Sequence, residues 1–315
     1  MILCCGEALI DMLPVSSAKG EAAFQPLAGG SVFNTSVALG RLGAPVSFLS
    51  GLSNDLFGAR LQAVLRESHV DLSYAVISNR PTTLAFVKLD NGQADYFFYD
   101  ENTAGRMLCE TDLPPLRDDV EALLFGGISL VSEPCGSTYE SLMRREAQHR
   151  VIMLDPNIRP AFIREADRHR ERLRRMFALA DIVKVSEDDL DWIEPARMRA
   201  DAIAAILRTG TKLVVLTAGE RGAKACWRDG EVEIEAVPVR IVDTVGAGDT
   251  FNAGILSALR DSGALNKQSL ANLQAGIIEN ALIFAARAAS VTVSRAGANP
   301  PWRHELMDDE RHPRQ

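Results

Sequence analysis

The chain has 315 residues, 47% of them hydrophobic and 24% charged, which is the balance of an ordinary soluble globular enzyme with one large domain or two. Its net charge of −8 gives no general attraction to nucleic acid or anionic membranes, so neither is expected as a partner and any phosphate site must be local. The five cysteines are scattered without C-x-x-C spacing, which argues against a disulfide framework or a zinc site and favours reduced thiols in the cytoplasm.

The N-terminal segment is predicted to form a buried strand that ends at Asp11. No basic segment precedes it, and Glu7 and Asp11 interrupt its apolar run, so we predict neither a signal peptide nor a membrane span. An acid at the end of a strand in an open α/β sheet is placed like a substrate ligand, although a solvated strand end fits equally well. Gly29-Gly30 then leads into a helix, with Asn34 near its first turn.

A strand over 46–52 and a helix over 57–66 come next. Residues 83–99 are rich in strand-forming residues and are broken by Asn91-Gly92, a strong hairpin signal. Such a hairpin does not belong to a βαβ series, so we expect a small separate sheet, formed with residues around 12–26. The aromatic run at 97–99 would be costly to leave in water and needs a partner surface, whether substrate, main domain or second subunit.

From residue 121 strands and helices alternate regularly. The predicted strands cover 122–130, 151–155, 181–185 and 212–217, and the helices between them cover 139–148, 168–179 and 198–208. This alternation is typical of right-handed βαβ units and a mainly parallel sheet, so the fold class is α/β. A strand over 237–242, helices over 246–260 and 268–288, a short strand over 291–293 and a tail from 303 complete the prediction.

The segment from Asp243 to Gly254, Asp-Thr-Val-Gly-Ala-Gly-Asp-Thr-Phe-Asn-Ala-Gly, falls at a predicted strand-to-helix turn. Small residues there let an anion approach the unpaired N–H groups at the positive end of a helix dipole. A carboxylate in such a turn repels a phosphate unless it takes a proton from the group that attacks it. Asp249 therefore has two interpretations with equal support, a general base or a helix cap.

These residues resemble a known family. The run Asp243 to Phe251 is similar to the C-terminal signature of the ribokinase/PfkB family of carbohydrate kinases, and Leu27 to Gly43 is similar to the family's N-terminal signature. The resemblance implies a ribokinase-like three-layer α/β/α fold. It places the kinase domain over 1–302, with a β lid from about 12–26 and 74–106, and leaves 303–315 as a flexible tail.

The resemblance also implies the roles of individual residues. The anion hole and the catalytic groups would be Gly246, Ala247, Gly248, Arg159 and the base Asp249. The sugar would be bound by Asp11, Gly29, Gly30, Asn34, Phe98, Arg106, Asn157 and Asp249. The nucleotide would be bound by Lys184, Ser186, Thr217, Gly219, Gly222, Gly246 and Gly248.

ATP with Mg²⁺ is the implied phosphoryl donor, and K⁺ is an implied activator. Asp243 lies in the region where many family members hold a monovalent cation. The element that usually reads N-x-x-E, associated with magnesium and phosphate, here has Ser186 and Asp189. Asp189 keeps the charge that Mg²⁺ needs for binding through water.

Within the family, residues 4–11, 82–86 and 98–106 look most like bacterial fructokinases. This narrower resemblance implies phosphorylation of fructose to fructose 6-phosphate. The cysteines favour a cytoplasmic enzyme, and a homodimer through the lid is one way to cover the aromatic run at 97–99. One alternative is a 2-keto-3-deoxygluconate kinase, whose acidic substrate would need a cation such as Arg106. The other is an inactive sugar-binding regulator, against which Asp249 and the intact Gly-Ala-Gly turn both argue.

Overall fold

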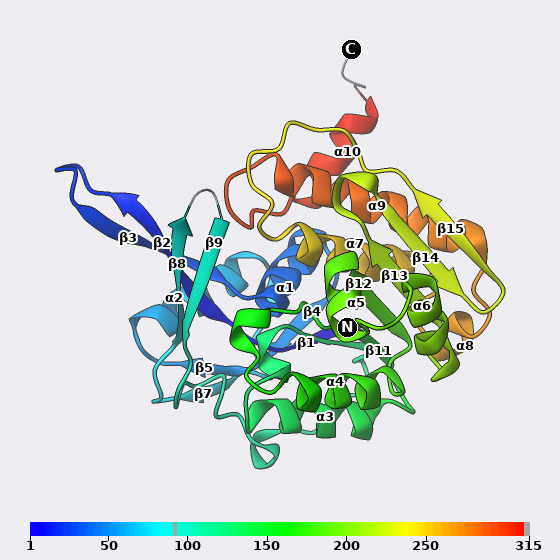
Figure 1. Ribbon diagram of the computed structural model, residues 1–315, viewed down its shortest axis with the longest axis horizontal. Helices are drawn as coiled ribbons and strands as arrows, with labels where there is room; N and C mark the ends of the chain where they lie inside the picture. Colours follow the sequence, from blue (N-terminus) through cyan, green and yellow to red (C-terminus); the bar gives the residue numbers. More distant parts are fainter. Residues whose placement is uncertain (91–92, 312–315) are drawn as a thin grey trace.

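In the computed structural model, which describes residues 1–90 and 93–311, nine strands form the main sheet. Their order is β15-β14-β13-β12-β11-β10-β1-β4-β6, and the pairs from β6 to β13 are parallel (Figure 1). The strands are β1 (Ile2–Cys5), β4 (Val46–Leu49), β6 (Val70–Asp71), β10 (Ala122–Gly126), β11 (Val151–Asp155), β12 (Ile182–Ser186), β13 (Leu213–Thr217), β14 (Ala223–Trp227) and β15 (Gly230–Ile234). The predicted α/β class with a mainly parallel sheet is confirmed.

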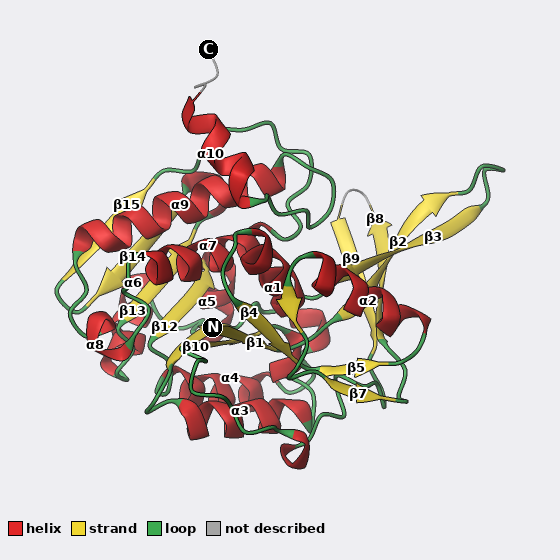
Figure 2. Ribbon diagram, turned by 180° about the vertical axis from the view of Figure 1, so that it is seen from behind, coloured by secondary structure: helices red, strands yellow, loops and turns green. Residues whose placement is uncertain are grey.

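Helices cover both faces of this sheet, because strands such as β1 are apolar on both sides (Figures 1 and 2). Ile2 and Cys4 belong to one hydrophobic core and Leu3 and Cys5 to the other, as the period of a strand requires. The first core is covered by α1 (Ser31–Arg41), α2 (Leu56–Glu67), α7 (Ala247–Asp261), α8 (Lys267–Leu270) and α9 (Ala275–Val293). The second is covered by α3 (Cys135–Glu146), α4 (Ala166–Phe177), α5 (Glu187–Ile193) and α6 (Arg199–Arg208).

A second sheet projects from one end of the body in the order β3-β2-β8-β9 (Figure 2). We call it the lid; it consists of β2 (Leu9–Ser16), β3 (Ala22–Gly29), β8 (Thr83–Asp90) and β9 (Gln93–Tyr99). β7 (Val76–Ser78), in the stretch that we assigned to the lid, instead pairs with β5 (Gly51–Ser53) in a sheet of two strands. The predicted turn at Asn91-Gly92 lies outside the described residues.

Three predicted strands divide or end earlier than we predicted. The predicted strand over 2–11 breaks at Gly6, where an added Cβ would lie 2.4 Å from Val32 Cγ2, so β1 stays in the main sheet and β2 enters the lid. The predicted strand over 46–52 divides into β4 and β5. The predicted strand over 122–130 ends at Gly126, because Gly127 has a φ of +68° and starts a 3₁₀ turn, η2 (Ile128–Leu130).

The C-terminal third differs from the prediction in more than boundaries. Residues 237–242 alternate like a strand, but they form no strand and pair with none in the part of the chain that the structure describes. Residues 291–293 form the last turn of α9, and the Val293 carbonyl accepts the N–H groups of Val242 and Asp243. The helix predicted over 268–288 is interrupted between α8 and α9, and the antiparallel edge strands β14 and β15 were not foreseen.

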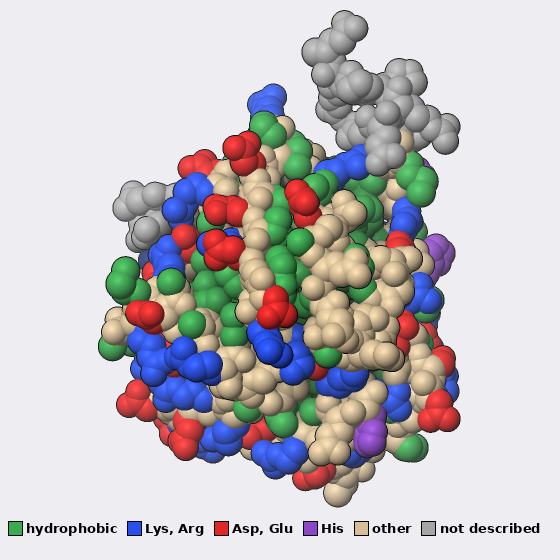
Figure 3. Space-filling view, turned by 90° about the vertical axis from the view of Figure 1, so that its right-hand side faces the viewer, with side chains coloured by type: hydrophobic (Ala, Val, Ile, Leu, Met, Phe, Trp, Pro, Cys, Tyr) green, Lys and Arg blue, Asp and Glu red, His purple; other side chains and the backbone are tan. Residues whose placement is uncertain are grey.

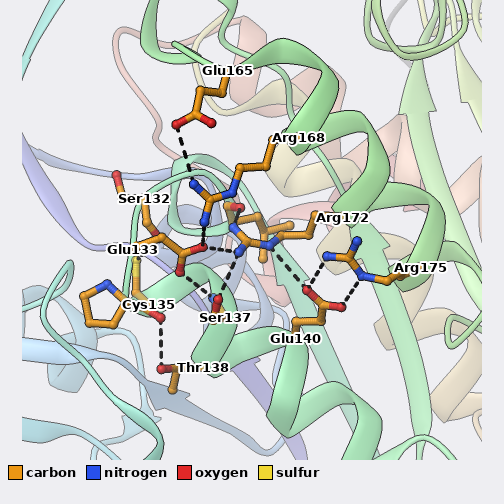
Figure 4. Close-up of polar contacts among 12 residues, drawn as sticks. Ser132, Glu133, Cys135, Ser137, Thr138, Glu140, Glu165, Arg168, Arg172 and Arg175 are labelled. Carbon is orange, nitrogen blue, oxygen red and sulfur yellow. Dashed lines mark hydrogen bonds and ion pairs between the residues drawn. The ribbon is translucent and has the colours of Figure 1, made fainter.

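The arginine-rich helix α4 is joined to α3 by ion pairs (Figure 4). Arg172 is buried and donates to Glu133 and Glu140, and it also donates to the Leu130 carbonyl at 2.8 Å. Arg175 donates to both oxygens of Glu140, at 2.7 and 3.0 Å. Because Arg172 is buried, removal of one partner would leave an uncompensated charge in the interior, so this network fixes how the two helices pack.

Among the described residues, α9 is the one helix whose length and apolar composition would suit a membrane span. It packs along α7 and against β14 and β15, and its buried positions include Ile278, Leu282 and Ala285. Hydrophobic side chains also gather in a strip among charged ones on the right-hand side of the molecule (Figure 3). The contacts of α9 with α7, β14 and β15 show that it is one of the helices that cover the main sheet.

Where we predicted a flexible tail over 303–315, the described residues after 302 form α10 (Arg303–Arg311). Arg303 pairs with Asp261 at 2.6 Å and donates to the Leu42 carbonyl at 3.2 Å. Leu306 is only 5% exposed and belongs to the first hydrophobic core. The start of α10 thus holds the ends of α1 and α7 together.

We expect Leu306→Ala to lower the free energy of unfolding by about 2 kcal/mol or more, because it leaves a cavity in the core. Met307 is 51% exposed, so Met307→Ala should change it by no more than about 0.5 kcal/mol. Urea unfolding of both variants measures the difference. Equal stability of both variants and the wild type would mean that the burial of Leu306 contributes nothing to stability.

Candidate active site

One cavity of about 1280 Å³ lies at the carboxyl ends of the parallel strands, below the lid. Its wall combines residues from both halves of the chain, which is where open α/β sheets bind their ligands. The predicted site residues in this wall are Asp11, Gly30, Asn34, Phe98, Asn157, Arg159, Lys184, Ser186, Asp189, Thr217, Gly219, Gly222, Gly246, Ala247, Gly248 and Asp249.

Asp249 lies in the first turn of α7, but its carboxylate does not cap the helix. The N-cap is Gly246, and no side-chain cap bond is present. The Asp249 carboxylate instead accepts Asn34 Nδ2 at 2.9 Å and Asn157 Nδ2 at 3.5 Å, from two other parts of the chain. With 6% exposure in the cavity wall, Asp249 is placed to act on a ligand, and the structure does not support the capping interpretation.

Burial raises the pKa of Asp249 to about 7. The hydrogen bond from Asn34 opposes this shift, Asp155 adds to it, and the cations of Lys184 and Arg159 oppose it. A carboxylate with a pKa near neutrality is a much stronger base than an ordinary aspartate and is still ionised in part at pH 7. Such a shift beside a cavity marks a candidate general base.

The turn that precedes Asp249 is shaped for close approach to the backbone. Gly246 has a φ of +78°, and an added Cβ would lie 2.7 Å from Ala298 Cβ, so only glycine fits there. The Ala247 N–H donates to the Thr244 carbonyl at 3.3 Å. Within the described residues the N–H groups of Gly248 and Asp249 have no partner, and they lie at the positive end of α7. The turn can therefore bind an anion.

A buried network that the sequence did not reveal lies beside this turn. Lys184 Nζ contacts Asp155 Oδ2 at 3.0 Å, and Asn252 Nδ2 donates to the same oxygen at 2.6 Å. Burial would lower the pKa of Lys184, but the carboxylates of Asp155, Asp189 and Asp249 raise it above its ordinary value. An added Cβ on Gly248 would lie 3.1 Å from Lys184 Nζ, so the positively charged amine lies next to the anion-binding turn.

Two spacings in the sequence could have pointed to this network. Asp155 opens the Asp-Pro-Asn-Ile-Arg element, and Asn252 lies three residues after Asp249, on the same side of a helix. Asn252 is buried, and its Oδ1 has no partner in the structure.

The loop after β11 carries Asn157 and Arg159 and is held from below by Asp189. Asn157 has a φ of +45°, which aims its amide at Asp249. Asp189 Oδ1 accepts the Ile158 N–H at 2.8 Å, and Asp189 Oδ2 accepts the Ser186 N–H at 3.1 Å. Ser186 in turn accepts the Asp189 N–H at 3.0 Å, a capping box at the start of α5. Ser186 and Asp189 thus brace this loop.

The opposite part of the wall suits a polyhydroxylated ligand. Asp11, on β2, has a pKa raised to about 6 by burial, with Arg159 opposing the shift. Gly29 makes room for it, because an added Cβ would lie 2.1 Å from Asp11 Oδ2. Phe98 packs edge-on against Phe162, with the two ring centroids 4.9 Å apart, and closes the wall on the lid side.

Three of the predicted residues, Gly29, Arg106 and Asp243, lie outside this wall. Arg106 pairs with Asp100 at 3.0 Å and donates to the Glu133 carbonyl at 3.2 Å. Asp243 accepts the N–H groups of Val245 at 3.0 Å and Gly297 at 2.9 Å. Asp243 therefore ties the loop before α7 to the loop after α9, beside the anion-binding turn rather than in it.

The far end of the cavity is apolar on one side. Thr217, Gly219 and Gly222 line it near the end of β13, while Val237, Val239 and Ile241 line it from the irregular segment that we predicted as a strand. Ala286 and Ala289 of α9 complete the lining. Apolar side chains next to a glycine-rich turn are suited to a planar base.

A family model described as pfkB family carbohydrate kinase matches residues 1–305. The chain belongs to the PfkB family of carbohydrate kinases. It is 54% identical over 281 residues to a fructokinase from Rhizobium leguminosarum bv. trifolii, covering 89% of this chain and 86% of that protein.

Solved structures agree with this assignment. A fructokinase from Xylella fastidiosa with bound ATP superimposes with a TM-score of 0.90 and 27% identity, covering 99% of both chains. A fructokinase from Vibrio cholerae O395, in a form with fructose, ADP and calcium ion bound, has a TM-score of 0.84 and 25% identity, covering 98% of this chain and 97% of that chain. The ribokinase-like fold and the resemblance read from the two signatures are confirmed.

The raised pKa of Asp249 predicts that the ionised form of this buried acid lowers the free energy of unfolding. The folded state holds the proton up to about pH 7 and the unfolded chain only up to about pH 4, so stability is lost as pH rises between these values. Asp249→Asn removes the effect. Its stability relative to the wild type should be greater at pH 8 than at pH 5, by about 2–3 kcal/mol. Urea unfolding at both pH values measures this, and an equal difference at the two would contradict it.

Proposed function

We propose that this PfkB kinase transfers the γ-phosphoryl group of ATP to the primary hydroxyl of fructose and forms fructose 6-phosphate. The observation that carries the proposal is the position of the Asp249 carboxylate. It is buried, its pKa is raised to about 7, and it lies in the first turn of a helix whose free N–H groups can bind an anion. The relatives named fructokinase, at 54% and 27% identity, favour fructose as the sugar.

The sugar would lie in the part of the cavity lined by Asp11, Gly30, Asn34 and Phe98. Its primary hydroxyl would donate its proton to Asp249 as the oxygen attacks the γ-phosphorus and the bond to the β-phosphate oxygen breaks, which leaves ADP. Asn34, with its amide on the carboxylate, orients Asp249 toward the sugar side.

The negative charge that develops on the transferred group would be held by fixed positive groups. The N–H groups of Gly248 and Asp249 stand at the end of α7, and Lys184 lies directly behind them. Arg159 lines the cavity opposite, where a guanidinium is suited to phosphate oxygens. Donors that are already in place need no reorganisation during the reaction. The nucleotide would extend toward Thr217, Gly219 and Gly222, with its base against Val237 and Ile241.

Mg²⁺ would enter with the ATP phosphates. The described residues contain no group of three or more His, Cys, Asp or Glu side chains that could hold a metal. Both Asp189 oxygens already accept backbone N–H groups, so Asp189 suits an ion through water rather than direct ligation. When bound, Mg²⁺ neutralises charge on the β- and γ-phosphates.

We also propose a monovalent cation, K⁺, beside Asp243, whose carboxylate joins the two loops next to the anion-binding turn. Carboxylate and carbonyl oxygens are the donors that such a cation prefers. Rates measured in potassium and in tetramethylammonium chloride test it, and equal rates would remove its support.

The outer face of the lid supports a homodimer. Phe24, Phe97 and Tyr99 are exposed there, and Phe24 and Tyr99 both pack edge-on against Phe86. An exposed aromatic cluster is costly in water, so we propose that a second copy covers it. Sedimentation of the purified protein tests this, and a monomer at micromolar concentration would refute it. The proposed use of ATP supports a cytoplasmic location.

The position of Arg106 argues against the alternative acidic sugar. The cation that we predicted for a 2-keto-3-deoxygluconate carboxylate, Arg106, is paired with Asp100 outside the wall. An inactive regulator would have no need for a buried acid with a raised pKa beside an anion-binding turn.

We expect fructose to have the highest kcat/KM among fructose, ribose, glucose, 2-keto-3-deoxygluconate and adenosine in a coupled assay of ADP release. A preference of tenfold or more, about 1.4 kcal/mol, for any sugar that is not a ketohexose would overturn the assignment of fructose. Absence of ADP release with every sugar would overturn the kinase assignment itself.

Asp249→Asn should lower kcat by about 10²–10⁴-fold, because an amide cannot take the proton of the sugar hydroxyl. The dissociation constants of ATP and sugar should move little, since other groups bind them. Asp261→Asn, on the same helix but outside the cavity wall, is the matched control and should keep near-normal kcat. A folded Asp249→Asn enzyme with more than about a tenth of the wild-type kcat would show that Asp249 is not the base.

A further inference from the structure

Glu7 is a buried acid in the cavity wall, and neither the two family signatures nor the proposed mechanism gives it a role. It lies between β1 and β2, where the chain leaves the main sheet and enters the lid. Its side chain lines the cavity next to Leu9 and Asp11, and the residue is 8% exposed. A carboxylate so removed from water needs compensating donors.

The two oxygens of Glu7 accept N–H groups from two different parts of the chain. Oε1 accepts the Ser31 N–H at 2.9 Å, and Oε2 accepts the Ser129 N–H at 3.3 Å. Ser31 is the first residue of α1, directly after the lid strand β3. Ser129 is in η2, directly after β10 of the main sheet. The Glu7 carboxylate thus joins three places: the start of the lid strand β2, the end of the lid strand β3, and the end of β10 in the main sheet.

The surrounding glycines are fitted to Glu7, Gly30 to its backbone and Gly127 to its carboxylate. Gly30 has a φ of +108°, and an added Cβ would lie 2.8 Å from the Glu7 carbonyl oxygen. Gly127 has a φ of +68°, and its added Cβ would lie 2.1 Å from Glu7 Oε1. Gly29 makes room for the Asp11 carboxylate, so the Gly29-Gly30 pair accommodates the side chain of Asp11 and the backbone of Glu7. The backbone at the start of α1 is therefore built around Glu7.

We propose that Glu7 is a positioning residue for the sugar: it fixes the Gly30-Ser31 backbone and the first turn of α1 against the cavity. The inference rests on the proposed function, since it assigns the sugar to this part of the wall. The rest of α1 does not depend on Glu7, because its buried residues pack along α7. Asn34 therefore keeps its bond to Asp249, and loss of Glu7 weakens sugar binding more than catalysis.

A carboxylate is needed here because its two donors approach different oxygens. A glutamine of the same shape has one acceptor oxygen, so one of the two N–H groups would face an NH₂ group. A negative charge is also favourable at the N-terminus of a helix. Glu7→Gln should therefore fold but release one side of the Gly30-Ser31 backbone.

The test is steady-state kinetics of Glu7→Gln with fructose and ATP, together with thermal unfolding. We expect the KM for fructose to rise tenfold or more, with kcat within about threefold and the KM for ATP within about twofold of wild type. Glu146→Gln is the control. Glu146 is also 8% exposed, but its carboxylate is held by Arg145 and Arg150 outside the cavity wall, so this variant should keep both KM values.

A second pair of variants approaches the same hydrogen bond from the donor. Ser31→Pro removes the N–H that Glu7 accepts, at the first helical position, where proline is tolerated. Ser31→Ala keeps that N–H and controls for the lost hydroxyl. We expect Ser31→Pro to raise the KM for fructose more than Ser31→Ala, and to add less than its full effect in the Glu7→Gln background.

An unchanged KM for fructose in folded Glu7→Gln overturns the proposal, as does an equal loss in kcat and in both KM values. If Glu7→Gln does not fold, the comparison of Ser31→Pro with Ser31→Ala decides, and equal KM values there overturn it. Failure of the proposed function is seen separately, in the wild-type enzyme. If that enzyme prefers another sugar, the same variants are measured with that sugar.

Discussion

A carboxylate buried at the positive end of a helix is the constraint on which this structure depends. Burial raises the pKa of Asp249, and the neighbouring charge of Asp155 raises it further. The groups that offset this cost come from distant parts of the sequence: Asn34 lies 215 positions away on α1, and Lys184 lies on the central strand β12. No short segment could hold this acid, so the fold must bring both halves of the chain together.

The packing of α7 shows how this is achieved. It lies between α1, which carries Asn34, and α9, and it approaches α9 so closely that an added Cβ on Gly254 would lie 2.5 Å from Ala285 Cα. Small residues on α7 thus let three helices meet over one side of the sheet, and α10 joins the ends of two of them through Arg303. The position of one carboxylate is set by the whole helical layer, and the same layer supplies its N–H groups for the anion.

The sequence predicted the parts of this arrangement that depend on local pattern. The alternation from residue 121 predicted the parallel sheet, and the Gly-Ala-Gly turn predicted an anion site, because both follow from periodicity and steric rules that act within a few residues. The strand over 237–242 failed because alternation cannot show whether a neighbouring strand exists. The tail after 302 failed because the burial of Leu306 depends on a core assembled from distant residues. Arg106 was placed by motif alone, and only the folded chain shows that Asp100 holds it.

An acidic chain that binds the triphosphate of ATP next to an aspartate must limit the repulsion between the two. Asp155 contributes in two ways, because its carboxylate keeps Lys184 charged and also raises the pKa of Asp249. The charge of Lys184 then attracts an anion to the turn, while Asp249 becomes a strong enough base to take a hydroxyl proton near neutral pH. A neutral residue in place of Asp155 would leave a buried lysine unpaired and weaken the base. One buried carboxylate outside the anion-binding turn therefore tunes both charges that phosphoryl transfer requires.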